Sequence, residues 1–293
     1  MNTARIKLIS TMVIFGTIGI FVRSIPMSSS IIAMVRGFVG AAFLLILAAL
    51  KKKPISVKAI KANLKYLILS GVFIGFNWIL LFEAYRFTTV ATATLCYYFA
   101  PIFVVLASHF MKTERMTAVK GVCIAVALLG MVFVSGVIGG GDFNAAGIAL
   151  GLGAAALYAG VILTNKRLKN ISSYDSTIVQ LSSAAIILVP YTLLTEDFSA
   201  MTVELSSIAL LLFVGVVNTG LAYNLYFGSI QALKAQTVAI MGYIDPVVAI
   251  ILSAIILREK MDVFSIIGAV LILGSAFCSE VFGDRKKVKT PKG

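Results

Sequence analysis

Two short polar stretches inside long apolar runs hold the residues with the clearest potential for chemistry. Asp245 and Pro246 lie near the centre of an apolar run that extends from about Ala235 to Ile256. A carboxylate at the centre of a bilayer costs roughly 2.5–3.5 kcal/mol on insertion scales, and it survives mostly beside a polar cavity or a partner. Such an acid could hold a cationic group of a ligand or carry a proton. Alternatively, it is a structural acid paired with Arg36 or with helix backbone.

The first half of the chain contains a second version of this stretch. Tyr97, Tyr98 and Pro101 lie in an apolar run from about Ala91 to Met111. Proline removes a backbone donor and bends a helix, so helix breaks are predicted at both Pro101 and Pro246. Proline-broken spans at matched positions in two halves of a chain indicate a transporter's binding site.

Arg36 is a cation deep inside a predicted span, Ser30–Leu50. It could bind the carboxylate of a ligand through two parallel hydrogen bonds. It could instead pair with Asp245 and hold the two halves of the protein in one state. The first role is substrate contact, and the second is structural or gating.

Polar and aromatic side chains recur in five of the predicted spans. Intramembrane amides need hydrogen-bond partners, and aromatic faces beside an acid can hold a cation or stack a flat ring. The predicted ligand-binding set is Asp245, Asn77, Trp78, Tyr98, Tyr158, Asn218, Tyr223 and Tyr243. Ordinary helix packing is the alternative for each aromatic residue. Glu280 lies near a span end and is interpreted as a structural acid that reaches water, and Glu259 as one that sets a turn.

The composition restricts the class of protein. Hydrophobic residues make up 60% of the 293 residues and charged residues 13%, whereas soluble domains carry about 25% charged residues. The mean hydropathy of +1.02 indicates a membrane protein. The net charge of +13 is spread over short loops rather than gathered on one patch, which argues against nucleic-acid binding. The three cysteines lie inside apolar runs without metal-ligand spacing, so neither a disulfide framework nor a metal site is expected.

Ten transmembrane helices are predicted from the apolar runs. Their approximate bounds are Leu8–Val22, Ser30–Leu50, Tyr66–Ala84, Ala91–Met111, Val119–Gly136, Ala146–Leu163, Ser176–Leu194, Ser206–Phe227, Ala235–Ile256 and Val263–Phe282. No cleavable signal peptide is evident. The first apolar run can itself serve as the insertion signal of a polytopic protein. Twenty of the 25 Lys and Arg residues fall on the side of the N-terminus, which predicts cytoplasmic termini and a multi-pass protein of the cell membrane.

An internal repeat organises the chain. A shift of 145 residues lays Tyr98 on Tyr243 and Pro101 on Pro246, with further matches upstream and downstream. The repeat unit contains five spans, and the odd number makes the second copy lie upside down relative to the first. The predicted fold is therefore an all-α polytopic membrane protein of two inverted five-helix repeats. The predicted divisions are a first repeat at 1–138, a linker at 139–145, a second repeat at 146–284 and a basic tail at 285–293.

These motifs resemble the ten-helix EamA group of the drug/metabolite transporter superfamily over essentially the whole chain. The first half carries Pro101, Thr113–Met116, Gly121 and Gly130, and the second half carries Asp245–Val247, Arg258–Met261, Ile267–Ala269 and Gly274. Arg36 also resembles an arginine found in the second helix of this group. The resemblance implies secondary transport, often export, of amino acids, other small metabolites or organic cations. It also implies that the helix carrying Arg36 lies outside the central cavity.

We therefore expect a secondary active transporter, with no enzymatic activity, that works by alternating access with a midplane site between the repeats. Export is the expected direction, and protons are the expected coupling ion, carried by Asp245. Arg36 would serve coupling or gating. No ATP-binding or dinucleotide motif occurs in a usable context, so no cofactor is expected. The expected partners are a small-molecule substrate and the bilayer, for a monomer or homodimer. The alternatives are a membrane channel, or a membrane-embedded structural or enzymatic protein without carrier activity.

Overall fold

The computed structural model describes residues 3–111, 117–138, 143–198, 204–230, 232–233 and 235–282. The first half of the chain contains α1 (Thr3–Gly16), α2 (Ile18–Arg23), α3 (Ser29–Leu50), α4 (Val57–Phe87), α5 (Val90–Tyr97), α6 (Ala100–Phe110) and α7 (Ala118–Val134). The second half contains α8 (Ala145–Asn165), α9 (Ser173–Thr195), α10 (Leu205–Gly215), the π-helix η2 (Val216–Leu221), α11 (Ala222–Ile230), α12 (Ala235–Gly242), α13 (Ile244–Ile256) and α14 (Val263–Phe282).

The protein is an all-helical polytopic membrane protein. Eight of the helical segments in the described part of the chain are long and apolar enough to cross a membrane, and two shorter apolar helices, α7 and α13, complete the predicted set of ten. The span expected at Tyr66–Ala84 is longer than predicted, because α4 already begins at Val57. The turn Thr113–Met116, most of the predicted linker and the basic tail lie outside the described residues.

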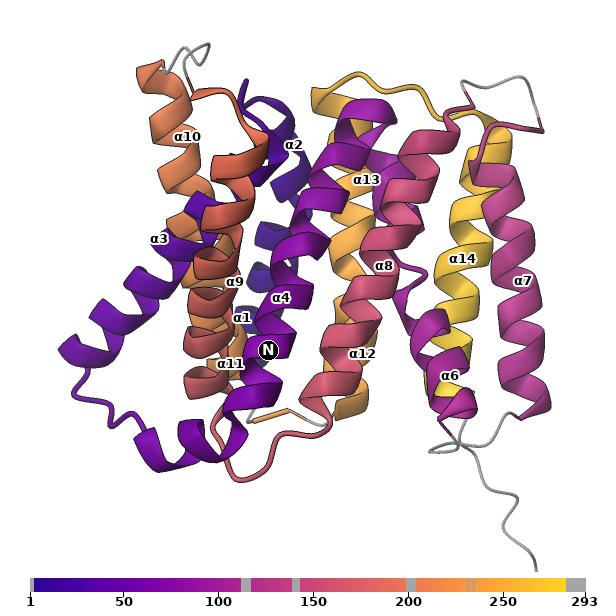
Figure 1. Ribbon diagram of the computed structural model, residues 1–293. Coiled ribbons are helices and arrows are strands. Elements are labelled where there is room, and N and C mark those ends of the chain that lie inside the picture. The colour runs from indigo at the N-terminus through magenta and orange to yellow at the C-terminus, as the bar shows by residue number, and fades with distance from the viewer. Residues whose placement is uncertain are drawn as a thin grey trace, which may run out of the picture.

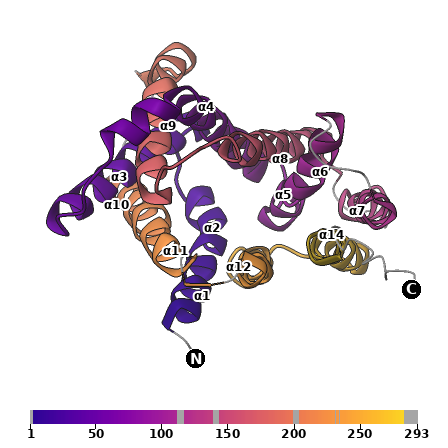
Figure 2. The ribbon, with the colours of Figure 1, turned by 90° about the horizontal axis from the view of Figure 1, so that it is seen from below.

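Helices from the two halves pack against each other in a matched pattern. The last helices of the halves, α7 and α14, lie side by side at one edge of the bundle, and α3 and α9 pack together near the other (Figure 2). The first helix of each half packs on a helix of the opposite half, α1 on α11 and α8 on α4. Helices α1 and α8 run in opposite directions through the bundle (Figure 1). This is the arrangement expected of two copies of one unit with inverted orientation.

Glycines allow the closest helix contacts between the halves. A side-chain carbon on Gly130 of α7 would lie 2.9 Å from the carbonyl oxygen of Gly268 on α14, and one on Gly268 would lie 2.6 Å from the oxygen of Gly130. Small residues permit such backbone approach in membranes, where packing rather than the hydrophobic effect holds helices together. A side-chain carbon on Gly16 would likewise meet the Asp245 carbonyl oxygen at 2.7 Å, so α1 rests directly on the start of α13.

The spans that contain Pro101 and Pro246 are both interrupted at their centres, whereas α9 continues through Pro190. The first is interrupted between α5 and α6, where Phe99 precedes the first turn of α6 and Pro101 lies within that turn. The second is interrupted at Tyr243, between α12 and α13, with Pro246 in the first turn of α13. A proline in the first turn of a helix costs little because the backbone N–H at that position has no intrahelical partner. The two breaks bring short helix ends and their polar residues to the middle of the bundle.

Candidate functional site

A cavity of about 600 Å³ lies at the two helix breaks. Its lining comes from both halves of the chain: α1, the α5–α6 break and α8 contribute, as do α11, α12, α13 and α14. We call it the main cavity. A smaller cavity of about 120 Å³ shares Asp245 and four tyrosines with it, and extends towards α2, α3 and the far end of α4. The set predicted from the sequence contributes Asp245, Tyr98, Tyr158 and Tyr223 to both cavities, Tyr243 to the main one and Trp78 to the smaller one.

Asp245 lies where the two helix breaks face each other. The Tyr98 hydroxyl, at the first break, donates a hydrogen bond to Asp245 Oδ2 at 2.9 Å and also lies 3.4 Å from the Gly242 carbonyl oxygen. Neither Asp245 nor Arg36 forms an ion pair within the part of the chain that the structure describes. In this arrangement the two residues therefore do not neutralise each other. The carboxylate is left with a single neutral side-chain partner at the edge of two cavities.

Arg36 lines the smaller cavity and is only 5% exposed. Its Nε donates to Thr219 Oγ1 at 2.7 Å, and its guanidinium carbon lies 4.1 Å from the centroid of the Trp78 ring. Thr219 belongs to η2, and a π-helical turn of this kind displaces side chains from their usual helical positions. The helix that carries Arg36 thus reaches the smaller cavity, whereas none of its residues lines the main cavity.

Tyrosines form most of the aromatic wall of the main cavity. The Tyr97 ring lies 5.2 Å from that of Tyr158 and 6.2 Å from that of Tyr98, between centroids, and Tyr98 lies 6.3 Å from Tyr243. These spacings suit edge-to-face or tilted aromatic contacts. Tyr226 also lines the cavity and was not among the predicted residues. Its position three residues after Tyr223, on the same face of α11, is the sequence signal that could have identified it.

Two predicted residues, Asn77 and Asn218, line neither cavity. Asn77 is 1% exposed and donates from Nδ2 to the Ala154 carbonyl oxygen at 2.5 Å, which joins α4 to α8. Asn218 is fully buried in η2 and donates to the Ile14 carbonyl oxygen at 2.6 Å, at the interruption between α1 and α2. Both amides hold helices together, so we leave them out of the ligand site.

Glu280, interpreted from the sequence as a structural acid, lines the main cavity. Tyr243 lines the same cavity. The site therefore contains a second carboxylate, near the end of α14. Among the described residues, no group of three or more His, Cys, Asp and Glu side chains is placed to hold a metal ion.

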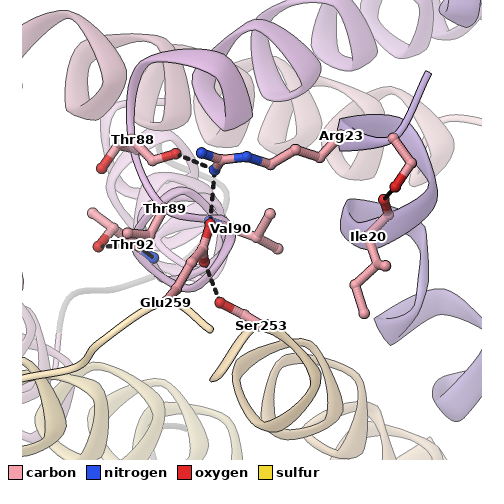
Figure 3. A network of polar contacts seen from close by, with 9 residues as sticks. Ile20, Arg23, Thr88, Thr89, Val90, Thr92, Ser253 and Glu259 are labelled. Atoms are coloured by element: carbon pink, nitrogen blue, oxygen red, sulfur yellow. Dashed lines mark hydrogen bonds and ion pairs between the residues drawn. The ribbon is translucent and has the colours of Figure 1, made fainter. Parts of the chain in front are cut away.

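A polar network closes one end of the bundle next to the smaller cavity (Figure 3). Arg23, at the end of α2, contacts Glu259 at 2.7 Å and also donates to the Thr88 carbonyl oxygen at 3.0 Å. Glu259 accepts further hydrogen bonds from the Val90 backbone N–H at 2.9 Å and from the Ser253 hydroxyl. This Arg23–Glu259 network joins the tip of α2, the start of α5 and the end of α13, which come from both halves.

The two cavities lie at different heights below this network. The lining of the main cavity reaches Ile162 and Glu280, close to the final residues of α8 and α14. Helix α8 is antiparallel to α4. Gly147, at the start of α8, lies against Thr88, just after the end of α4, and Lys169, just beyond the end of α8, donates its backbone N–H to Asn63 near the start of α4. The main cavity therefore extends towards the end of the bundle away from the Arg23–Glu259 network. The smaller cavity lies between the main cavity and this network.

The sequence matches proteins named as transporters, and the fold matches a solved structure. A model of the EamA-like transporter family matches residues 3–136 and again residues 145–280. "Uncharacterized transporter YxxF" of Bacillus subtilis is 28% identical to the chain, over 100% of this chain and 94% of that protein. A protein of Salmonella typhimurium named "Probable amino-acid metabolite efflux pump" is 27% identical, over 77% of this chain and 79% of its own length. A solved crystal structure with 16% sequence identity covers 95% of this chain and 97% of its own at a TM-score of 0.67, which shows a shared fold.

Proposed function

Given that the chain belongs to the EamA-like transporter family, we propose that it is a secondary carrier that exports a small zwitterionic metabolite of the amino-acid class by alternating access. The observation that carries this proposal is a pair of buried, opposite charges that face one cavity without contacting each other. Asp245 and Arg36 both line the smaller cavity, and neither has an ion-pair partner among the described residues.

Each of these charges calls for a complementary group in the substrate. Removing a charge from water costs several kcal/mol unless a partner compensates it. The Arg36 guanidinium has one neutral hydrogen-bond acceptor, Thr219, and two neighbouring aromatic rings, Trp78 and Phe82. Its planar fork suits a carboxylate. Asp245 has one hydroxyl donor and suits an ammonium group. A substrate with only a cationic group would leave Arg36 uncompensated, which favours amino acids over organic cations.

The relatives' names are consistent with this class. Proteins of Salmonella typhimurium and Escherichia coli that match the chain are each named "Probable amino-acid metabolite efflux pump". The tyrosines of the main cavity would provide contact area for a side chain of varied shape, because aromatic walls accept apolar, flat or cationic groups.

For the transport cycle, we take the observed arrangement as the inward-facing state. The Lys and Arg distribution supports an orientation with the Arg23–Glu259 network at the outer face and the mouth of the main cavity on the cytoplasmic side. Opening outwards would then require the two halves to tilt about the helix breaks and the network to separate. Because the network joins elements of both halves, it would act as the outer closure of the cycle.

Proton coupling would follow from competition at Asp245. A proton and the substrate's ammonium group would bind the same carboxylate, so each would weaken the binding of the other to the same extent. If the substrate leaves Asp245 and a proton binds it on the outer side, and the reverse happens on the cytoplasmic side, an inward proton gradient would drive export. Tyr98 would hold the Asp245 side chain in position in both the proton-bound and the substrate-bound state.

Ligand derivatives that lack one charge test the proposal. Purified protein would be screened against amino acids by thermal shift, and the amino acid with the largest effect compared with its amide and with its N-acetyl form. We expect stabilisation by the zwitterion alone, and expect Arg36→Gln and Asp245→Asn each to reduce it. Equal stabilisation by the amide would refute the carboxylate role of Arg36 and would support an organic-cation carrier.

A further inference from the structure

A basic pocket lies at the end of the bundle opposite the Arg23–Glu259 network, and the transport cycle proposed above does not use it. The hollow has a volume of about 700 Å³. Five basic side chains line it: Lys58 and Lys65 of α4, and Lys166, Arg167 and Lys169 of the α8–α9 connection. No acidic residue belongs to the lining within the described parts of the chain. This concentration of positive charge attracts anions.

The pocket has a fixed shape, because one buried amide joins its two walls. Asn63 on α4 is 3% exposed. Its Nδ2 donates to the Lys169 carbonyl oxygen at 2.8 Å, and its Oδ1 accepts from the Lys169 backbone N–H at 2.9 Å. Cytoplasmic loops of membrane proteins are commonly basic, but that tendency predicts scattered lysines such as Lys51 and Lys52, which are not part of this pocket. It does not predict a hollow built from two segments about a hundred residues apart.

The pocket also lies at the height of lipid headgroups. Helix α4 has 31 residues and is about 46 Å long at 1.5 Å per residue, which exceeds the hydrocarbon thickness of about 30 Å. Its first turns therefore extend into the headgroup layer. Leu69 lies one helical turn beyond Lys65 on the same face and is 44% exposed, and the neighbouring Ile68 is 41% exposed. An apolar surface thus begins directly beside the basic one.

We propose that this pocket binds the phosphate-bearing headgroup of an anionic phospholipid, with an acyl chain lying along Ile68 and Leu69. Basic pockets at the cytoplasmic surface of helix bundles suit such headgroups, because each Lys or Arg near the surface adds electrostatic attraction. Asp175 is not part of the pocket lining and is only 4% exposed, although its carboxylate accepts at 3.5 Å from the backbone N–H of Ser56, which does line the pocket. The site bridges α4 of the first half and the α8–α9 connection of the second, and it is independent of the substrate cavity.

Lipid titrations of the purified full-length protein test this site. Wild-type protein in a neutral detergent would be titrated with phosphatidylglycerol and with phosphatidylcholine, and the melting temperature followed. The test variant combines Lys58→Gln, Arg167→Gln and Lys169→Gln. The control combines Lys51→Gln, Lys52→Gln and Lys61→Gln, which removes the same charge from exposed residues outside the pocket. Glycerol phosphate and inorganic phosphate form separate arms.

We expect phosphatidylglycerol, but not phosphatidylcholine, to raise the melting temperature of the wild type and of the control variant. The test variant should melt like the wild type without lipid and need about tenfold more phosphatidylglycerol, or more, for the same shift. Equal loss in both variants, or equal effects of the two lipids, would overturn the proposal. An equal response to glycerol phosphate or inorganic phosphate would overturn the assignment to a lipid and identify a soluble phosphate ligand instead.

Discussion

Removal of the Arg23 guanidinium should shift the protein towards its outward-open state. In the Arg23→Gln variant, the contact to Glu259 at 2.7 Å and the hydrogen bond to the Thr88 carbonyl oxygen at 3.0 Å are both lost. The Arg23 side chain is 39% exposed, so solvent screens the ion pair and limits it to about 1 kcal/mol. The hydrogen bond contributes about 1 kcal/mol or less. A combined effect of about 1–2 kcal/mol changes the ratio of the two states by a factor of about 5–30.

Cysteine labelling from outside the membrane measures this shift. The native cysteines are replaced, and Ile18→Cys, in the lining of the smaller cavity, reports access from the outer face. We expect a membrane-impermeant maleimide to label the reporter about 5–30 times faster in the Arg23→Gln background, if labelling follows the open population. Arg86→Gln is the matched control, because its partner Glu83 lies on the same helix and their contact spans no interface. Unchanged labelling in Arg23→Gln, or the same acceleration in Arg86→Gln, would refute the role of the network.

Three further predictions separate transport from folding. Asp245→Asn should abolish accumulation driven by a pH gradient in proteoliposomes, and unaltered pH dependence of uptake would contradict proton coupling at this residue. Gly130→Val should lower the free energy of unfolding by about 1–3 kcal/mol, because its side chain would meet the backbone of α14 at 2.9 Å. Gly274→Ala is the control: a side-chain carbon there would meet no atom within 4 Å, so the melting temperature should not change. Asn77→Leu should destabilise the protein by about 0.6–2 kcal/mol through loss of its hydrogen bond to α8, and the ligand affinity should not change. A lower affinity in a stably folded variant would show that Asn77 belongs to the ligand site.

The organisation of the fold could be predicted because it rests on local signals. Apolar runs of membrane-spanning length predict helices, and the duplicated prolines fall where α6 and α13 begin. The start of α4 was missed because Lys58, Lys61 and Lys65 interrupt the hydrophobic pattern. Charged residues do not end a helix, however, when the helix extends beyond the bilayer and the side chains are solvated.

The membership of the site could be predicted only in part, because it depends on how each helix is rotated in the bundle. The aromatic residues and Asp245 face the cavity, whereas Asn77 turns towards α8 and forms a helix contact. Glu280 was interpreted as a structural acid that reaches water, because it lies near the end of a predicted span. That end of the span borders the main cavity. The contact between Arg23 and Glu259 joins residues 236 positions apart, and no spacing in the sequence indicates it.

Exchange of an amino acid across a proteoliposome membrane tests the carrier mechanism most directly. Vesicles loaded with the unlabelled amino acid that gives the largest thermal shift are diluted into a trace of the radiolabelled form. An alternating-access carrier with its site at Arg36 and Asp245 should accumulate label transiently above the outside concentration, and Arg36→Gln should reduce this overshoot. A linear flux of label, unaffected by unlabelled amino acid on the opposite side, would contradict the carrier mechanism.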